Sequence, residues 1–252
     1  MELQYVTARA LLLNMLALKL GQNIGGIANR NSFSNVFSLD YDGVDDYVNL
    51  SNAVGVVDVN RGTFSAWVKL ETTSINAPVF KYYVNANNQI TIIYLHASNQ
   101  IKFMYKAAGT NTQVQAATVI EGGGYAHVAL TWDTGANELK AFINGSQFGA
   151  TQSGFGTWSG SATVLHLGHN ALSGTDFWKG NIDEFAIFGR AKTNAEILSI
   201  YNGGKPSNLV GEDGLVGYWR NEEGSGTTIG DQSGQGNSGT LINGTTFSTD
   251  VA

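Results

Sequence analysis

Four aspartates lie close together in the chain and could supply oxygen ligands to a cation. Asp40, Asp42, Asp45 and Asp46 all belong to a single DYDGVDD segment. Calcium prefers hard carboxylate and carbonyl oxygens, often taken from several residues of one loop. The same side chains could instead accept hydrogen bonds from the N–H groups of a tight turn. The segment therefore predicts either a calcium site or a turn that is held by its own aspartates.

Catalytic chemistry finds less support. Enzymes that hydrolyse glycosidic bonds hold two carboxyl groups across the bond that is cleaved. Asp183 and Glu184 are adjacent, and successive side chains of a strand point to opposite faces, so this pair should not act on one substrate. His166 and His169 are expected in one strand and should also face opposite sides, which disfavours a zinc site. We therefore expect no enzymatic activity.

Two tryptophans are candidates for contact with a sugar. Trp158 in FGTWSG and Trp178 in DFWKG lie near expected loops. Aromatic rings offer the broad apolar surface on which a sugar ring can stack, although single exposed aromatic residues are also common on protein surfaces. These positions predict glycan binding.

Composition limits the class of protein. The 252 residues are 42% hydrophobic and 13% charged, which is typical of a globular chain with one large domain and a short appendage. The formal net charge is −6, and the 14 Lys and Arg residues form no basic run, which argues against a nucleic-acid partner. Cysteine is absent, which excludes disulfides and thiolate metal sites.

The first 20 residues have the apolar spacing of a helix. Positions at alternating intervals of three and four form a heptad seam, namely Leu3, Val6, Ala10, Leu13, Ala17 and Leu20. Such a helix should bury this seam against its own domain, against copies of itself or against another protein. We assign residues 1–35 to a docking or oligomerisation segment with a linker. The apolar run 10–18 is too short to span a membrane, and its retention after Met1 argues against a cleaved signal peptide.

From residue 36 onward the pattern is that of β-strands. Short runs of alternating apolar residues are separated by turn residues, which favours an antiparallel sandwich or barrel. The runs are 37–50, 62–70, 89–95, 101–106, 112–120, 126–132, 139–145 and 163–169. Asn144 and Gly145 between two of these runs predict a hairpin turn. Trp67 and Trp132 lie inside strong strand patterns and are expected in the core.

One short helix is predicted near 193–202. Thr193 and Glu196 have the spacing of a capping box, in which each side chain bonds the backbone N–H of the other residue. Gly203 and Gly204 can end the helix in a left-handed conformation, and Pro206 prevents its continuation.

Several of these segments together resemble laminin-G-like modules of the concanavalin A-like lectin and glucanase superfamily. The segments are LDYDGVDDYVNL (39–50), HVALTWDTGANELKAFINGSQFG (127–149), LHLGH (165–169) and FWKGNIDEFAIFGRAKTNAEILSIYNGG (177–204). The resemblance implies an all-β fold, a two-sheet antiparallel jelly-roll sandwich over residues 36–252. The tail 205–252 would either add a last strand through Leu215, Val216, Tyr218 and Trp219 or extend from the sandwich.

The resemblance also adds to the candidate sites. Related lectin-like modules often hold calcium at the rim of the sandwich, and Asp183 lies in the closing strand of the family pattern. The predicted Ca²⁺ ligands are therefore Asp42, Asp45, Asp46 and Asp183. Trp178 lies where the family usually has an aromatic residue, which favours a structural role for it.

The arrangement of the tail bears on function. Residues 214–244 resemble the segment that often begins such modules but here follow the module, as in laminin-G-like proteins of tailed phages. The resemblance implies a non-catalytic virion component, such as a capsid decoration or fibre protein, which contacts other virion proteins or its own copies through the N-terminus. The alternative is an extracellular, calcium-dependent carbohydrate-binding and adhesion module whose partners are cell-surface glycans.

Overall fold

The computed structural model describes residues 33–117, 120–171 and 174–252. The predicted N-terminal helix therefore lies outside the described residues, and so does its docking seam of Leu3, Val6, Ala10, Leu13, Ala17 and Leu20. Within the described ranges, no helix is long and apolar enough to cross a membrane. Residues 35–252 form one compact unit.

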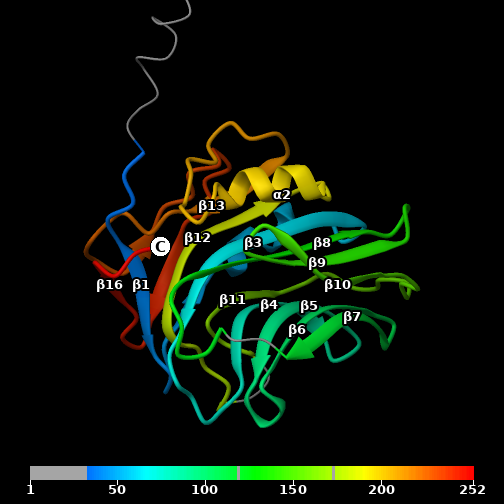
Figure 1. Cartoon of the computed structure of the whole chain (residues 1–252), viewed down its shortest axis with the longest axis horizontal. Coiled ribbons are helices and arrows are strands. Elements are labelled where there is room, and N and C mark those ends of the chain that lie inside the picture. The colour runs from blue at the N-terminus through cyan, green and yellow to red at the C-terminus, as the bar shows by residue number, and fades with distance from the viewer. Residues whose placement is uncertain (1–32, 118–119, 172–173) are drawn as a thin grey trace, which may run out of the picture. The chain divides into compact units, whose positions relative to one another are not determined.

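Two antiparallel sheets form the sandwich and confirm the predicted fold class (Figure 1). Sheet A has the order β10 (Ser146–Gln152), β9 (Glu138–Ile143), β8 (Ala126–Asp133), β3 (Arg61–Leu70), β12 (Lys179–Phe188), β1 (Ser38–Asp42) and β16 (Thr246–Ser248), with β13 (Leu215–Trp219) also paired to β12. Sheet B has the order β14 (Thr228–Ile229), β15 (Gly239–Ile242), β2 (Tyr47–Asn49), β11 (Val164–Leu167), β4 (Ala77–Asn85), β5 (Asn88–Leu95), β6 (Gln100–Ala107) and β7 (Thr110–Ala117). Two 3₁₀ helices, η1 (Ser51–Val56) and η2 (His96–Ser98), follow β2 and β5.

The core lies between the two sheets. Alternate side chains point inward along the regular parts of the strands, as the period of a strand requires. The rings of Phe64 in β3 and Phe80 in β4 meet across the core with centroids 4.2 Å apart, and Phe185 in β12 lies 5.9 Å from both. Trp132 is fully buried beside Phe64, as predicted. Trp67 is also buried, but it stacks on Tyr201 outside the inter-sheet core.

The Asn144–Gly145 turn joins β9 and β10 in the predicted hairpin. Both residues have positive φ, +50° and +74°, which two-residue hairpin turns favour because the turn then follows the twist of the strands. A Cβ atom at Gly145 would lie 2.8 Å from the Tyr201 ring. Glycine is therefore required here both for its conformation and for space.

Helix α2 (Asn194–Tyr201) covers the outer face of sheet A (Figure 1). Its capping box is present, since the Thr193 hydroxyl accepts from the Glu196 N–H and the Glu196 carboxylate accepts from the Thr193 N–H. Ile197 and Ile200 pack against the outer side chains of sheet A. The helix ends at Asn202, which is left-handed with φ +48°, because asparagine also tolerates this conformation. Gly203 follows with φ +67°, in the predicted left-handed conformation.

The C-terminal tail adds strands to both sheets. β13 lies beside β12, and β16 lies beside β1, so two strands of the tail belong to sheet A. β14 and β15 extend sheet B next to β2. Trp219 is fully buried, and its ring stacks on Phe185 of β12 with centroids 5.7 Å apart, which holds the tail onto the sandwich. Its indole N–H donates to the Asn237 carbonyl within the tail.

Candidate functional site

The aspartate turn between β1 and β2 brings three of the four predicted calcium ligands together. Carboxylate oxygens of Asp42, Asp45 and Asp46 lie within 4.8 Å of one another. Asp42 also accepts from the Val44 N–H at 2.7 Å, and Asp46 accepts from the Asp42 N–H at 3.0 Å. These bonds are the turn contacts that the sequence predicted as the alternative. The other carboxylate oxygens leave the turn chemically able to bind a cation, so calcium binding here stays a prediction.

Asp183 does not join these three aspartates. The register of β1 with β12 places Asp42 opposite Lys179, four residues away from Asp183 along the strand. Asp183 is completely buried and accepts a hydrogen bond from the Asn35 side-chain amide at 2.8 Å. Burial is the main reason that its pKa is raised to about 7. The structure therefore separates the predicted calcium ligands into two places.

A β-bulge at this point corrects our expectation that Asp183 and Glu184 face opposite sides. Glu184 has φ +50°, and the register with β3 shifts between Asp183 and Ala186. The extra residue breaks the alternation, so that Ile182 and Phe185 both enter the inter-sheet core while the two acids stay outside it. Burial and the neighbouring Asp183 charge raise the pKa of Glu184.

The contacts of these two carboxyl groups are structural. Glu184 accepts from the Tyr218 hydroxyl and lies 3.3 Å from the Arg220 guanidinium. Both carboxyl groups are nearly inaccessible to solvent, and therefore to a substrate. The oxygens Asn35 Oδ1, Asp183 Oδ1 and Asn221 Oδ1 are buried without a hydrogen-bond partner among the described residues. Such oxygens are chemically suited to a hard cation, so a calcium role for Asp183 also stays a prediction.

His166 and His169 also differ from our expectation. Their Nδ1 atoms lie 3.3 Å apart, and their rings stack at 5.5 Å between centroids. Gly168, with φ +77°, lies between them and turns the chain out of the strand, so that both rings reach the same side. Burial, followed by the charge of His169, lowers the pKa of His166 to about 4.

The two predicted glycan-binding tryptophans lie in different environments. Trp178 is fully buried in the core, so its ring cannot stack on a ligand. Trp158 is half-buried, stacks on Tyr82 at 5.9 Å and donates its indole N–H to the Gly160 carbonyl. It lines a hollow of about 670 Å³, the rim hollow, with Val59, Asn60, Tyr105, Thr134, Asn137 and residues 154–157. Trp158 therefore remains a candidate for ligand contact.

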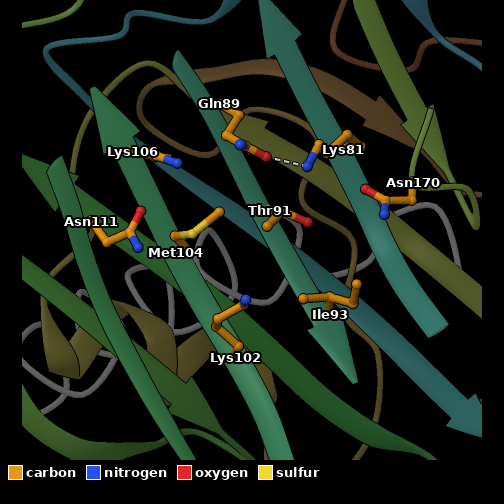
Figure 2. Close-up of a pocket in the computed structure, with 9 residues that line it drawn as sticks. All are labelled: Lys81, Gln89, Thr91, Ile93, Lys102, Met104, Lys106, Asn111 and Asn170. Carbon is orange, nitrogen blue, oxygen red and sulfur yellow. Dashed lines mark hydrogen bonds between the residues drawn. The ribbon is translucent and has the colours of Figure 1, made fainter. Parts of the chain in front are cut away.

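A second hollow, which the sequence did not predict, lies on the outer face of sheet B (Figure 2). This lysine hollow has a volume of about 250 Å³ and is lined by Lys81, Gln89, Thr91, Ile93, Lys102, Met104, Lys106, Asn111 and Asn170. These side chains come from β4, β5, β6 and β7, and Asn170 comes from the segment after β11. Gln89, Thr91 and Met104 are buried although they point away from the core. These three buried side chains form the floor of the hollow.

The alternation of residues along the strands predicts part of this hollow, namely that its lysines lie on an outer face. Lys81 alternates with the core residues Phe80 and Tyr82, and Lys102 and Lys106 alternate with core residues of β6. This alternation places each lysine on an outer face. It does not tell which strands are neighbours, because pairing depends on contacts between distant parts of the chain.

The comparisons with known proteins agree with this architecture. Residues 42–198 match the concanavalin A-like lectin/glucanases superfamily. The chain belongs to this superfamily. No curated protein matches the chain.

Several solved structures share the fold of this superfamily member. A candidate carbohydrate-binding protein from Bacteroides ovatus ATCC 8483 is 17% identical with a TM-score of 0.62, over 87% of this chain and 61% of that protein, so the chain spans less than two thirds of it. The CBM40 module of the Ruminococcus gnavus IT-sialidase, bound to α2,3-sialyllactose, is 14% identical with a TM-score of 0.55, over 67% of this chain and all of that module. Domain 4 of the arabinanase AbnA from Geobacillus stearothermophilus, in complex with arabinotriose, is 20% identical with a TM-score of 0.51, over 65% of this chain and 76% of that domain.

Proposed function

We propose that this chain is a non-catalytic carbohydrate-binding module, and that the lysine hollow on sheet B holds the sugar. The observation that carries the proposal is the buried polar floor of this hollow. The Gln89 amide bonds Lys81 and the Ala86 carbonyl, and the Thr91 hydroxyl donates to the Phe80 carbonyl, so both polar groups are held in place. Met104 adds apolar surface beside them. A few fixed polar groups set in an apolar surface are typical of small-molecule sites.

The surroundings of the hollow support this proposal. Helix α2 covers the outer face of sheet A, whereas no α-helix of the described residues covers sheet B. Asn111 is exposed at the edge of the hollow, and Asn170 reaches it from the opposite side. A sugar could therefore enter from solvent and meet amide groups on both sides. The fold neighbours that are carbohydrate-binding modules support the same class of ligand.

A glycan array with the full chain tests the proposal, and three variants locate the site. Asn111→Ala should lower binding of any glycan found on the array about tenfold, because one side-chain hydrogen bond at the hollow is lost. Gln152→Ala is the control, since it lies on β10 of sheet A, away from the hollow. Trp158→Ala tests the rim hollow. Loss of binding in Trp158→Ala alone would mean that the sugar binds in the rim hollow instead. A glycan array without any binding would refute carbohydrate binding.

We also propose that residues 1–35 attach this module to other virion proteins or to copies of itself. The support is the heptad seam of the sequence together with the likeness of the tail to phage proteins. Light scattering of the full chain beside a chain that lacks residues 1–35 tests the attachment. An oligomer that becomes a monomer on truncation supports it, and two monomers of equal behaviour contradict self-association. Binding to purified capsid or tail proteins tests the remaining partner class.

A further inference from the structure

We infer that the sugar bound in the lysine hollow is anionic, and that Lys81, Lys102 and Lys106 hold its carboxylate or sulfate group. This inference rests on the proposed carbohydrate-binding function and names the chemical class of the ligand. It follows from the position of the three lysines, from their lack of an acidic partner among the described residues, and from their mutual repulsion.

The three lysines surround one patch of sheet B. In the strand register, Lys81 of β4 lies opposite Thr91 of β5, which lies opposite Met104 of β6. Lys102 and Lys106 flank Met104 at two residues on either side, so they share its face. With strands about 4.8 Å apart, Lys81 lies about 10 Å from the β6 backbone. Flexible lysine side chains can span this distance and converge on one small anionic group.

These lysines are without acidic partners in the part of the chain that the structure describes. Most other described cations lie within 4 Å of a carboxylate, as Lys69, Lys140 and Arg190 do. No such pair involves Lys81, Lys102 or Lys106, and Lys81 donates instead to the neutral side-chain oxygen of Gln89. The acidic group that acts on Lys81 from nearby is Asp176, whose carboxylate already accepts from the Asn170 amide at 2.7 Å.

The hollow thus concentrates positive charge on a chain whose net charge is −6. Burial, followed by the charge of Lys102, lowers the pKa of Lys81 to about 8. Burial and the charge of Lys106 lower the pKa of Lys102 as well. A bound anion would relieve this repulsion, and partly buried charges attract an anion more strongly than exposed ones do. The floor of Met104 and Thr91 leaves room for the uncharged part of a sugar beside the charged group.

Titration calorimetry of the full chain at constant ionic strength tests the inference with matched probes. These are lactose, 3′-sialyllactose, 3′-sulfolactose and inorganic phosphate. We expect one of the two charged sugars to bind at least tenfold more tightly than lactose. Preference for 3′-sialyllactose would identify the bound group as a carboxylate, and preference for 3′-sulfolactose would identify it as a sulfate. Lys102→Gln and Lys106→Gln should each weaken this binding about tenfold. Lys140→Gln, a lysine of sheet A outside the hollow, should leave it unchanged.

The outcomes separate the inference from the proposed function. Two outcomes would overturn the anionic ligand and leave carbohydrate binding intact. One is equal affinity for lactose and the charged sugars. The other is array binding that is confined to neutral glycans and is weakened by Asn111→Ala. Phosphate that binds as tightly as the charged sugars overturns the sugar part of the inference. A blank array together with no binding of any of the three sugars refutes both. Unchanged binding in Lys102→Gln and Lys106→Gln overturns the assignment of the lysines.

Discussion

At the scale of single residues, burial of ionisable groups is the feature with the clearest consequences. Asp183 has no cation within salt-bridge distance among the described residues, and its pKa is raised to about 7. In the unfolded chain the pKa of an aspartate is near 3.9. Between these two values the folded state holds a proton that the unfolded state has lost. Protein stability is therefore greatest below the unfolded pKa and is lost as the pH rises through the folded one.

We predict from this that the free energy of unfolding falls by about 2–3 kcal/mol between pH 5 and pH 8 because of Asp183. Asp183→Asn keeps the shape of the side chain and removes its titration. Urea unfolding at both pH values, in the presence of a chelator, measures the effect. The variant should lose this share of the difference between the two pH values, and Glu184, whose pKa is also raised by burial, should keep the remainder. A wild-type chain that is equally stable at pH 5 and pH 8, with Asp183→Asn behaving identically, would contradict the prediction.

Calcium binding by the predicted aspartates can be tested through its effect on protein stability. A ligand that binds only the folded state stabilises it by about 2.7 kcal/mol at a hundred times its Kd. We expect CaCl₂ to raise the melting temperature, and we expect Asp45→Asn to abolish the increase, since Asp45 is exposed and its carboxylate is available. If Asp183→Asn alone abolishes the increase, the ion binds at the bulge instead. A melting temperature that calcium leaves unchanged would refute both locations.

At the scale of elements, the sequence was informative wherever structure depends on near neighbours. The Asn144–Gly145 turn and the Thr193 capping box were predicted because each depends on residues within four positions of one another. The bulge at Glu184 was not predicted. A β-bulge needs a shift against the partner strand β3, and the residues of β12 alone look like a regular strand.

The capping box gives a prediction for α2. Thr193→Ala should lower the free energy of unfolding by about 1 kcal/mol, because the Glu196 N–H loses the side-chain bond that satisfies it at the start of the helix. Urea unfolding measures this difference. Thr193→Ser keeps the hydroxyl and should retain most of the stability. Equal losses in the two variants would mean that the methyl group of Thr193, rather than its cap, is what matters.

At the scale of the whole molecule, the two-sheet fold could be predicted but the lysine hollow could not. Alternating runs and the resemblance to laminin-G-like modules indicated a sandwich, and the structure confirms it. The lysine hollow forms only because β4, β5 and β6 are neighbours, which brings together Lys81 and Lys106 from different strands. Trp178 was a sugar-binding candidate for a similar reason, since a tryptophan near an expected loop looks exposed until its neighbours are known.

The C-terminal tail supplies strands to both sheets, so cooperative folding should depend on it. A chain that ends after residue 210 would lack β13, β14, β15 and β16 and would expose core side chains of both sheets. We expect it to lose cooperative urea unfolding and the near-ultraviolet circular dichroism signal of its buried aromatic residues. A full-length chain that is cleaved once in the 205–212 segment should keep both, because the tail can stay bound. Unchanged cooperative unfolding of the shortened chain would contradict the prediction.

The pairing of the tail with the first strands also sets an order of events during synthesis. β1 and β2 are made early, yet β1 pairs with β16 and β2 pairs with β15, which are made last. While the chain is being translated, one edge of each of these strands has free N–H and C=O groups that could pair with another nascent chain. The sandwich can close only after translation has passed Ser248. Chaperones that bind exposed strand edges should therefore matter more for the yield of this protein than for its final stability.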